Sequence, residues 1–117
     1  MSIQHAVLFA FEPELGTQGE EDMLAQVRAW PEAIGGFEAL RIGRAISTER
    51  TRGYQYLLFM ELADEAALDA YQVHPVHQRF AAWVVDHGGT VLALDYHLDR
   101  ATVLVPAGAG GAAGARE

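Results

Sequence analysis

Cysteine is missing from the 117 residues of this chain, and basic residues are scarce. Without cysteine there is no disulfide, no thiolate metal ligand and no cysteine nucleophile, whereas the redox compartment stays undetermined. Only 8 basic residues accompany 16 acidic ones, which gives a formal net charge of −8. A charge of this sign repels phosphate backbones and anionic lipid surfaces, so neither a nucleic acid nor a membrane is expected as a partner.

Long apolar runs are missing as well. No segment approaches the roughly 18 to 20 consecutive apolar residues of a membrane-spanning helix, and the first residues lack the basic stretch and long apolar run of a secretion signal. We therefore expect a soluble, cytoplasmic protein. Half of the residues are apolar and 21% are charged, as in an ordinary globular chain. At this length the sequence predicts a single domain.

The domain is expected to span residues 1–100, and residues 101–117 are expected to form a flexible tail. From Pro106 onward the sequence is mostly alanine and glycine, with few side chains that can pack. In an alternative interpretation, Thr102–Val105 docks as an arm on a partner subunit. Gly108–Gly114 follow no predicted strand and open no helix, so these glycines indicate a linker and not a phosphate-binding loop.

The periodicity of the first 100 residues predicts four strands and three helices. Alternating side chains indicate strands at 3–11, 37–46, 54–62 and 90–98. Apolar spacings of three and four indicate a helix at 19–30, which Pro31 ends, a second helix that Asp64 caps, and a third that Pro75 opens. The order β, α, β, β, α, α, β is that of a ferredoxin-like α+β fold with a four-stranded antiparallel sheet.

The strands of this sheet are apolar on both faces. In the first strand Ile3, His5, Val7, Phe9 and Phe11 alternate with Gln4, Ala6, Leu8 and Ala10. An antiparallel sheet that is open to water normally has one polar face. Ala6, Leu8, Leu57 and Phe59 would form one exposed apolar patch on a monomer. We therefore expect a homodimer in which the sheets of two copies pack together.

The segment Tyr71-Gln72-Val73-His74-Pro75-Val76-His77 gathers a phenol and two imidazoles at a break between helices. Imidazoles exchange protons near neutral pH, and a tyrosine hydroxyl donates a hydrogen bond to a developing oxyanion. His5, Tyr56 and Asp95 are expected to point into the same space if the helices cover that face of the sheet. The sequence therefore predicts a small acid/base pocket.

Each of these residues also has a purely structural interpretation. His74 precedes a proline and is expected to be a capping or turn residue. A carboxylate such as Asp95 beside His77 would suit either a structural imidazole or a general base with a fixed tautomer. Tyr71 and His5 would also serve as core or lining residues. His87 and His97 are expected at the surface.

A metal site is not expected. His74 and His77 are three residues apart, as paired ligands on one helix face are, but Pro75 disturbs the helix there and no third ligand lies at a recognisable spacing. The sequence also contains no nucleophile elbow and no dinucleotide-binding fingerprint.

Between about Ile3 and Leu98 the sequence resembles the stress-responsive dimeric α/β-barrel (Dabb) family. The resemblance rests on His5 at the start of an apolar strand, the pair Gly53-Tyr54, the HPVH core of the 71–77 segment, Phe80, and Asp95-Tyr96 in the last strand. It implies a homodimer in which two sheets pack face to face, which agrees with the two apolar faces of the strands.

One member of this family is a plant polyketide cyclase that closes a linear poly-β-ketone by an aldol reaction without metal or organic cofactor. By resemblance to it, His77 would remove a proton between two carbonyls, Tyr71 would hold the oxygen, and Asp95 would orient His77. The implied cavity lining is His5, Val7, Phe9, Met23, Leu24, Val27 and Leu58. Tyr56 replaces a histidine of the cyclase and Gly88 replaces a bulky aromatic residue, so the pocket shape is expected to differ.

The leading hypothesis is therefore a cofactor-independent acid/base enzyme that acts on a small, largely apolar, oxygenated substrate, with aldol cyclisation as its most concrete version. A non-catalytic, stress-associated dimer that binds a hydrophobic small molecule is the alternative from a different class. A lyase that uses the same tyrosine and histidine is a further alternative. HPxH segments occur throughout the family, including members without known activity, so this motif indicates the fold more than the reaction.

Overall fold

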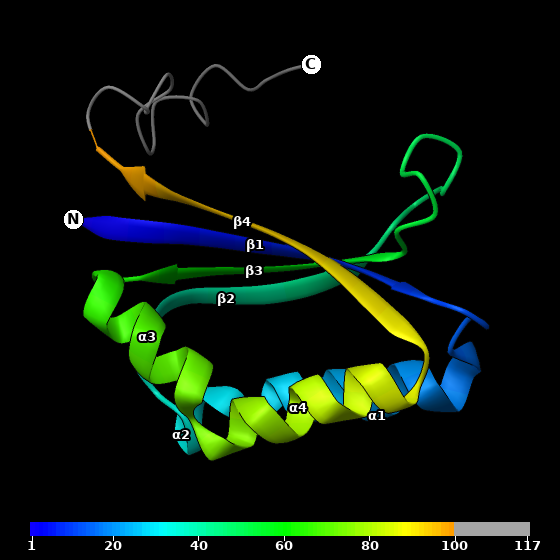
Figure 1. Ribbon diagram of the computed structural model, residues 1–117, viewed down its shortest axis with the longest axis horizontal. Coiled ribbons are helices and arrows are strands. Elements are labelled where there is room, and N and C mark those ends of the chain that lie inside the picture. The colour runs from blue at the N-terminus through cyan, green and yellow to red at the C-terminus, as the bar shows by residue number, and fades with distance from the viewer. Residues whose placement is uncertain (100–117) are drawn as a thin grey trace, which may run out of the picture.

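The computed structural model describes residues 1–99, which form two layers, a β-sheet and a layer of helices on one of its faces (Figure 1). Along the chain the elements are β1 (Ser2–Phe11), α1 (Gly16–Arg28), α2 (Trp30–Ala33), β2 (Phe37–Arg44), β3 (Tyr56–Leu62), α3 (Glu65–Val73), α4 (Pro75–Asp86) and β4 (Gly89–Leu98). The strands lie in the order β2-β3-β1-β4 with antiparallel neighbours. This is the predicted ferredoxin-like α+β fold. The expected tail and the Thr102–Val105 arm lie outside the described residues.

The core lies between the helices and the inner face of the sheet. β1 is a central strand, and its inward side chains Phe9 and Phe11 pack against the aromatic rings of Phe80 and Trp83 in α4. The complete set of buried core residues is Val7, Phe9, Phe11, Met23, Val27, Trp30, Tyr56, Leu58, Met60, Leu62, Tyr71, Phe80 and Val84. Within residues 1–99, no helix combines the length and the apolar character that crossing a membrane requires.

The first helix differs from the prediction at both ends. α1 begins at Gly16, three residues earlier than expected, and ends at Arg28. Pro31 does not end a helix but lies in the first turn of the short helix α2, where its missing N–H leaves no helical hydrogen bond unmade. Gly35 and Gly36, both with positive φ, then lead the chain into β2.

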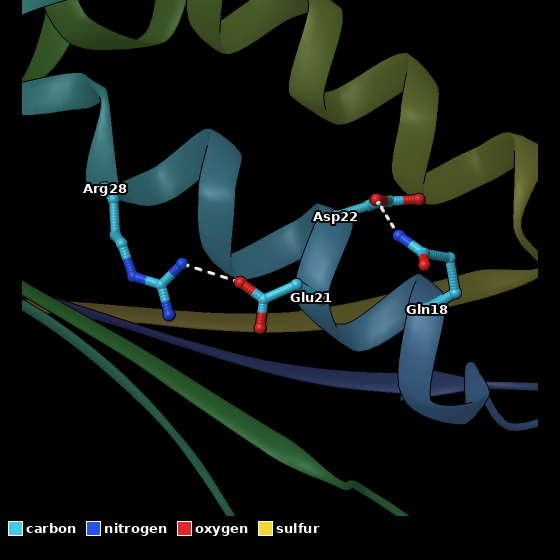
Figure 2. A network of polar contacts seen from close by, with 4 residues as sticks. All are labelled: Gln18, Glu21, Asp22 and Arg28. Atoms are coloured by element: carbon cyan, nitrogen blue, oxygen red, sulfur yellow. Dashed lines mark hydrogen bonds and ion pairs between the residues drawn. The ribbon is translucent and has the colours of Figure 1, made fainter.

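The solvent side of α1 carries a short row of polar contacts (Figure 2). Gln18 donates a hydrogen bond to Asp22 at 2.8 Å, and Arg28 pairs with Glu21 at 2.9 Å. Both members of the ion pair are largely exposed, so each such contact contributes about 0–1 kcal/mol. These residues support the helix and do not take part in the site described below.

The connection between β2 and β3 is longer than expected, because β2 ends at Arg44 and β3 begins at Tyr56. Gln55 closes this connection. Its side chain bonds both the N–H and the carbonyl of Phe11, and its own N–H donates to the carbonyl of Phe9 at 2.7 Å. Its carbonyl accepts a hydrogen bond from the N–H of Ala45 at 2.8 Å, so the residue ties the end of the connection to the chain on both sides.

The break between α3 and α4 follows the prediction. Oδ1 of Asp64 accepts a hydrogen bond from the N–H of Ala67 at 2.9 Å and caps α3. His74 is extended before Pro75, with ψ of 136°, and its Nδ1 accepts a hydrogen bond from the N–H of Val76 at 3.1 Å. The interpretation of His74 as a capping residue is thus confirmed.

Gly88 lies at the turn between α4 and β4, where the chain passes the main chain of Glu12. Its φ is +76°, and a Cβ would lie 2.3 Å from the main-chain oxygen of Glu12. In Gly88→Ala the main chains at residues 88 and 12 have to move apart. We therefore expect a loss of about 3 kcal/mol or more in the free energy of unfolding, measured by urea denaturation. Gly36→Ala is the control, because φ there is +84° but no atom lies within 4 Å. It should lose only about 1–2 kcal/mol, and equal losses in the two variants would contradict the close approach.

The outer face of the sheet, away from the helices, is apolar as predicted. Leu8 pairs with Leu57 on one side and Leu92 on the other, and Ala6 pairs with Phe59 and Leu94. Leu57 is 45% exposed and Leu94 is 63% exposed. A hollow of about 850 Å³ lies on this face, and its lining includes Leu8, Leu57, Phe59, Leu92, Arg41, Arg44, Arg50 and Arg52.

Candidate active site

A second, smaller cavity of about 300 Å³ lies on the helix side of the sheet, between the β1–β4 pair and helices α3 and α4. Its volume is about that of ten water molecules. Most of its walls are apolar, and the polar side chains among them are His5, Gln72, Tyr71 and His77. The full lining is His5, Val7, Phe9, Leu58, Tyr71, Gln72, His77, Phe80, Ala81, Val84, Val85, Gly89, Val91 and Ala93.

Tyr71 of α3 forms one wall of this cavity. The residue is only 3% exposed, and its ring packs against Trp30, His5 and His77. No residue within 1–99 makes a hydrogen bond to its hydroxyl. This hydroxyl is not among the sealed side-chain atoms of that range without a partner, so it is accessible, and the Tyr71 side chain lines the cavity. Burial raises the pKa of this phenol well above its ordinary value, so it stays a hydrogen-bond donor.

His77 of α4 lies against Tyr71, with 4.3 Å between the ring centroids. Its Nδ1 lies 3.1 Å from the carbonyl oxygen of Gln72. A carbonyl only accepts hydrogen bonds, so Nδ1 carries the proton and Nε2 keeps a free lone pair. Desolvation lowers the pKa of His77 below its ordinary value of 6.5; the hydrogen bond to Gln72 opposes this shift, and the charge of His5 adds to it. At neutral pH, His77 is therefore an uncharged base.

Asp95 does not orient His77, and that expectation is wrong. Asp95 Oδ1 instead accepts a hydrogen bond from Nδ1 of His5. The two residues are directly opposite each other in the β1–β4 register, which places their side chains on the same face. Within residues 1–99, the side chain of His77 has one hydrogen-bond partner, the carbonyl of Gln72.

The expected lining residues are divided between this cavity and the rest of the core. His5, Val7, Phe9 and Leu58 lie in the wall as expected. Met23, Leu24 and Val27 do not, because they belong to α1 and pack into or against the core cluster outside the cavity.

Tyr56 lies outside this cavity too. Its hydroxyl donates a hydrogen bond to Glu20 of α1 at 2.8 Å. Burial and the neighbouring Glu20 raise the pKa of Tyr56 to about 12. Its ring packs against Phe11 in the core, away from Tyr71 and His77, so it takes no part in the acid/base pocket that the sequence predicted.

Several lining residues escaped the sequence analysis, although the sequence carries their signal. Phe80, Ala81 and Val84 follow His77 at helical spacings of three, four and seven, and so share its face of α4. In β4, Gly89, Val91 and Ala93 alternate toward Asp95. Gly88 precedes Gly89 of this wall and has no room for a side chain.

The remaining histidines lie outside this cavity. His74 caps α4, His87 bonds to the carbonyl of Trp83, and His97 pairs with Glu65 at 2.9 Å. His87 and His97 are exposed, as expected. In the described part of the chain, no three His, Asp or Glu side chains are grouped so that they could hold a metal ion.

The family model described as "Stress responsive A/B Barrel Domain" matches residues 3–98 of this chain. No curated protein matches the chain. Several solved structures share its fold. A dimeric ferredoxin-like protein of unknown function from Jannaschia sp. CCS1 has a TM-score of 0.70 at 27% identity, covering 84% of this chain and all of the other.

Two further structural neighbours are less similar in sequence. Another dimeric ferredoxin-like protein of unknown function, from Thermobifida fusca YX, has a TM-score of 0.73 at 22% identity, covering 84% of this chain and 92% of the other. A hydroxynitrile lyase from Passiflora edulis has a TM-score of 0.74 at 13% identity, covering 85% and 94%. Identities this low indicate a common fold and not a common reaction.

Proposed function

This chain belongs to the stress-responsive A/B barrel domain (Dabb) family, and on that basis we propose that it is a cofactor-independent acid/base enzyme for a small, largely apolar, oxygenated substrate. One observation carries the proposal: a Tyr71 hydroxyl and a His77 Nε2, neither with a hydrogen-bond partner within residues 1–99, border the same apolar cavity. Apolar walls with a donor and a base are what proton abstraction next to a carbonyl requires.

The most concrete version of this function is an aldol cyclisation of a poly-β-ketone. Nε2 of His77 accepts a proton from the carbon between two carbonyls. The electron pair of that C–H bond passes to the carbonyl oxygen, and the Tyr71 hydroxyl donates a hydrogen bond to the enolate that results. The enolate carbon then attacks a second carbonyl of the same substrate and closes the ring. Low-dielectric walls strengthen both interactions.

A lyase reaction is the second version of the same chemistry. The hydroxynitrile lyase from Passiflora edulis shares the fold, which supports including a hydroxynitrile among the test substrates. In this version His77 takes the proton of a substrate hydroxyl while a bond to a carbon leaving group breaks, and Tyr71 again contacts the oxygen.

The Tyr71→Phe variant tests the proposal. It removes only a hydroxyl that has no hydrogen bond within residues 1–99, so the fold should be unaffected. We expect the turnover of a poly-β-ketone or a hydroxynitrile to fall by about 10²–10³-fold, the usual cost of one lost oxyanion donor. Chromatography of the products measures the turnover. Tyr54→Phe, on the loop that borders the outer hollow, is the control. Unchanged turnover in Tyr71→Phe would remove Tyr71 from the mechanism.

We also propose that the chain forms a homodimer through the outer face of its sheet. Two of its structural neighbours are dimeric ferredoxin-like proteins. The face itself supports the proposal, because Leu57, Leu92, Leu94 and Tyr96 are all exposed there in a single copy. Contiguous apolar surface of this kind is typical of an interface between proteins.

A further inference from the structure

We propose that His5 is a second proton-transfer group of the cavity and that Asp95 positions it, an inference that rests on the proposed acid/base function. His5 is only 4% exposed and lies in the cavity wall with Tyr71 and His77. Its hydrogen bond to Asp95 makes it a carboxylate–imidazole pair, an arrangement that the mechanism above does not use.

The geometry gives His5 a defined tautomer. A carboxylate only accepts hydrogen bonds, so Nδ1 of His5 carries a proton and Nε2 is the atom left for proton exchange. The ring meets that of Tyr71 edge-on at 5.9 Å between centroids, and Tyr71 in turn contacts His77. The phenol that would hold a substrate oxygen therefore touches both imidazoles.

The two imidazoles have different electrostatic surroundings. The groups that face His5 are Asp95 from β4, Tyr71 from α3 and His77 from α4, while its β3 neighbour Met60 does not titrate. The Asp95 carboxylate balances the positive charge of a His5 imidazolium. His77 has a carbonyl, that of Gln72, beside Nδ1. One imidazole held by a carboxylate and one held by a carbonyl thus share the cavity.

This pairing completes the proton balance of the aldol step. The substrate C–H bond breaks, its proton goes to Nε2 of His77, and its electron pair forms the new carbon–carbon bond by way of the enolate. The oxygen of the attacked carbonyl takes a proton from Nε2 of a His5 imidazolium, whose other proton stays on Nδ1 in the hydrogen bond to Asp95, and becomes a hydroxyl. The enzyme is left with a charged His77 and a neutral His5, and proton exchange with water restores both.

Two variants of the full chain test the role of His5, namely His5→Gln and Asp95→Asn. The asparagine keeps the shape of Asp95 and an acceptor oxygen but removes its charge. We expect kcat for a poly-β-ketone to fall about 10²-fold in His5→Gln and about 10-fold to 10²-fold in Asp95→Asn, with little change in KM. The pKa of His77, followed by NMR titration without substrate, should rise in His5→Gln, because the charge of His5 lowers it in the wild type.

His97→Gln is the matched control. His97 lies on β4 and, like His5, pairs with a carboxylate, that of Glu65, but it does not line the cavity. The variant should change neither kcat nor the titration of His77. A purely structural His5 would leave kcat and its pH profile unchanged in both His5→Gln and Asp95→Asn. An unchanged rate in His5→Gln together with a large loss in His77→Gln would overturn the inference and leave the proposed function standing. An unchanged rate in both would overturn the proposed function itself.

Discussion

Replacing His77 with glutamine is expected to lower kcat/KM for the cavity's substrate by about 10³-fold, the middle of the range for a lost general base. The glutamine amide can still donate a hydrogen bond to the carbonyl of Gln72, which now receives one from Nδ1 of the imidazole. It has no basic nitrogen in place of Nε2. The variant therefore removes the proton acceptor and keeps the local hydrogen bond, and steady-state kinetics with a poly-β-ketone measures the loss.

The pH dependence of the wild-type rate follows from the same residue. Desolvation holds the pKa of His77 below 6.5, so the base stays unprotonated and active at neutral pH. The rate should fall only as the pH drops through this lowered pKa. The linkage to stability has the same sign, because the unfolded chain binds a proton at His77 more readily near pH 6 than the folded chain does. Stability should decline on acidification below about pH 6.5, and less so in His77→Gln.

His87→Gln provides the control for this experiment. His87 follows the end of the same helix and its Nδ1 also bonds to a main-chain carbonyl, that of Trp83 at 2.8 Å, but it is exposed and lies outside the cavity. Its removal should leave both the rate and the pH profile as they are. Equal rates in His77→Gln and the wild type would show that this imidazole is not the base.

Replacing Leu57 with glutamate is expected to convert the dimer into a folded monomer. Leu57 lies in the middle of the apolar outer face, beside Leu8. A symmetric interface would bury two carboxylates, and the desolvation of each costs several kcal/mol, so the dissociation constant should rise by at least about 10³-fold. Light scattering coupled to size-exclusion chromatography measures the molecular mass. Because this side chain is half exposed in one copy, circular dichroism should show an intact fold.

Val73→Glu is the matched control for Leu57→Glu. Val73 is also exposed and apolar, but it lies at the end of α3, on the helix side of the sheet. The substitution adds the same charge to the chain without touching the outer face, so the Val73→Glu protein should remain dimeric. A wild-type protein that is monomeric at micromolar concentration, or a dimeric Leu57→Glu protein, would contradict the proposed interface.

The fold could be predicted from the sequence because its strands and helices carry strong periodic patterns. β1 and β3 show two apolar faces, and Asp64 and Pro75 mark helix starts that the structure confirms. The boundaries of α1 could not be predicted, since Pro31 is equally compatible with ending one helix and opening the next. Propensity alone does not distinguish these two uses.

The candidate site could be predicted only in part, for reasons of tertiary arrangement. Tyr71 and His77 belong to one local segment, so their proximity is encoded in the sequence itself. The partner of Asp95 depends on the β1–β4 register, which joins residues 90 positions apart. The error over Met23, Leu24 and Val27 has a similar cause, because an apolar helix face does not reveal which half of a sheet it covers.

The sheet separates the cavity from the outer face. His5, Val7 and Phe9 line the cavity from one side of β1, while Ala6 and Leu8 emerge on the other. A twin subunit seated on the far side would add no group to the chemistry. Each dimer would then contain two independent active sites. The rate should depend on substrate concentration hyperbolically, without cooperativity.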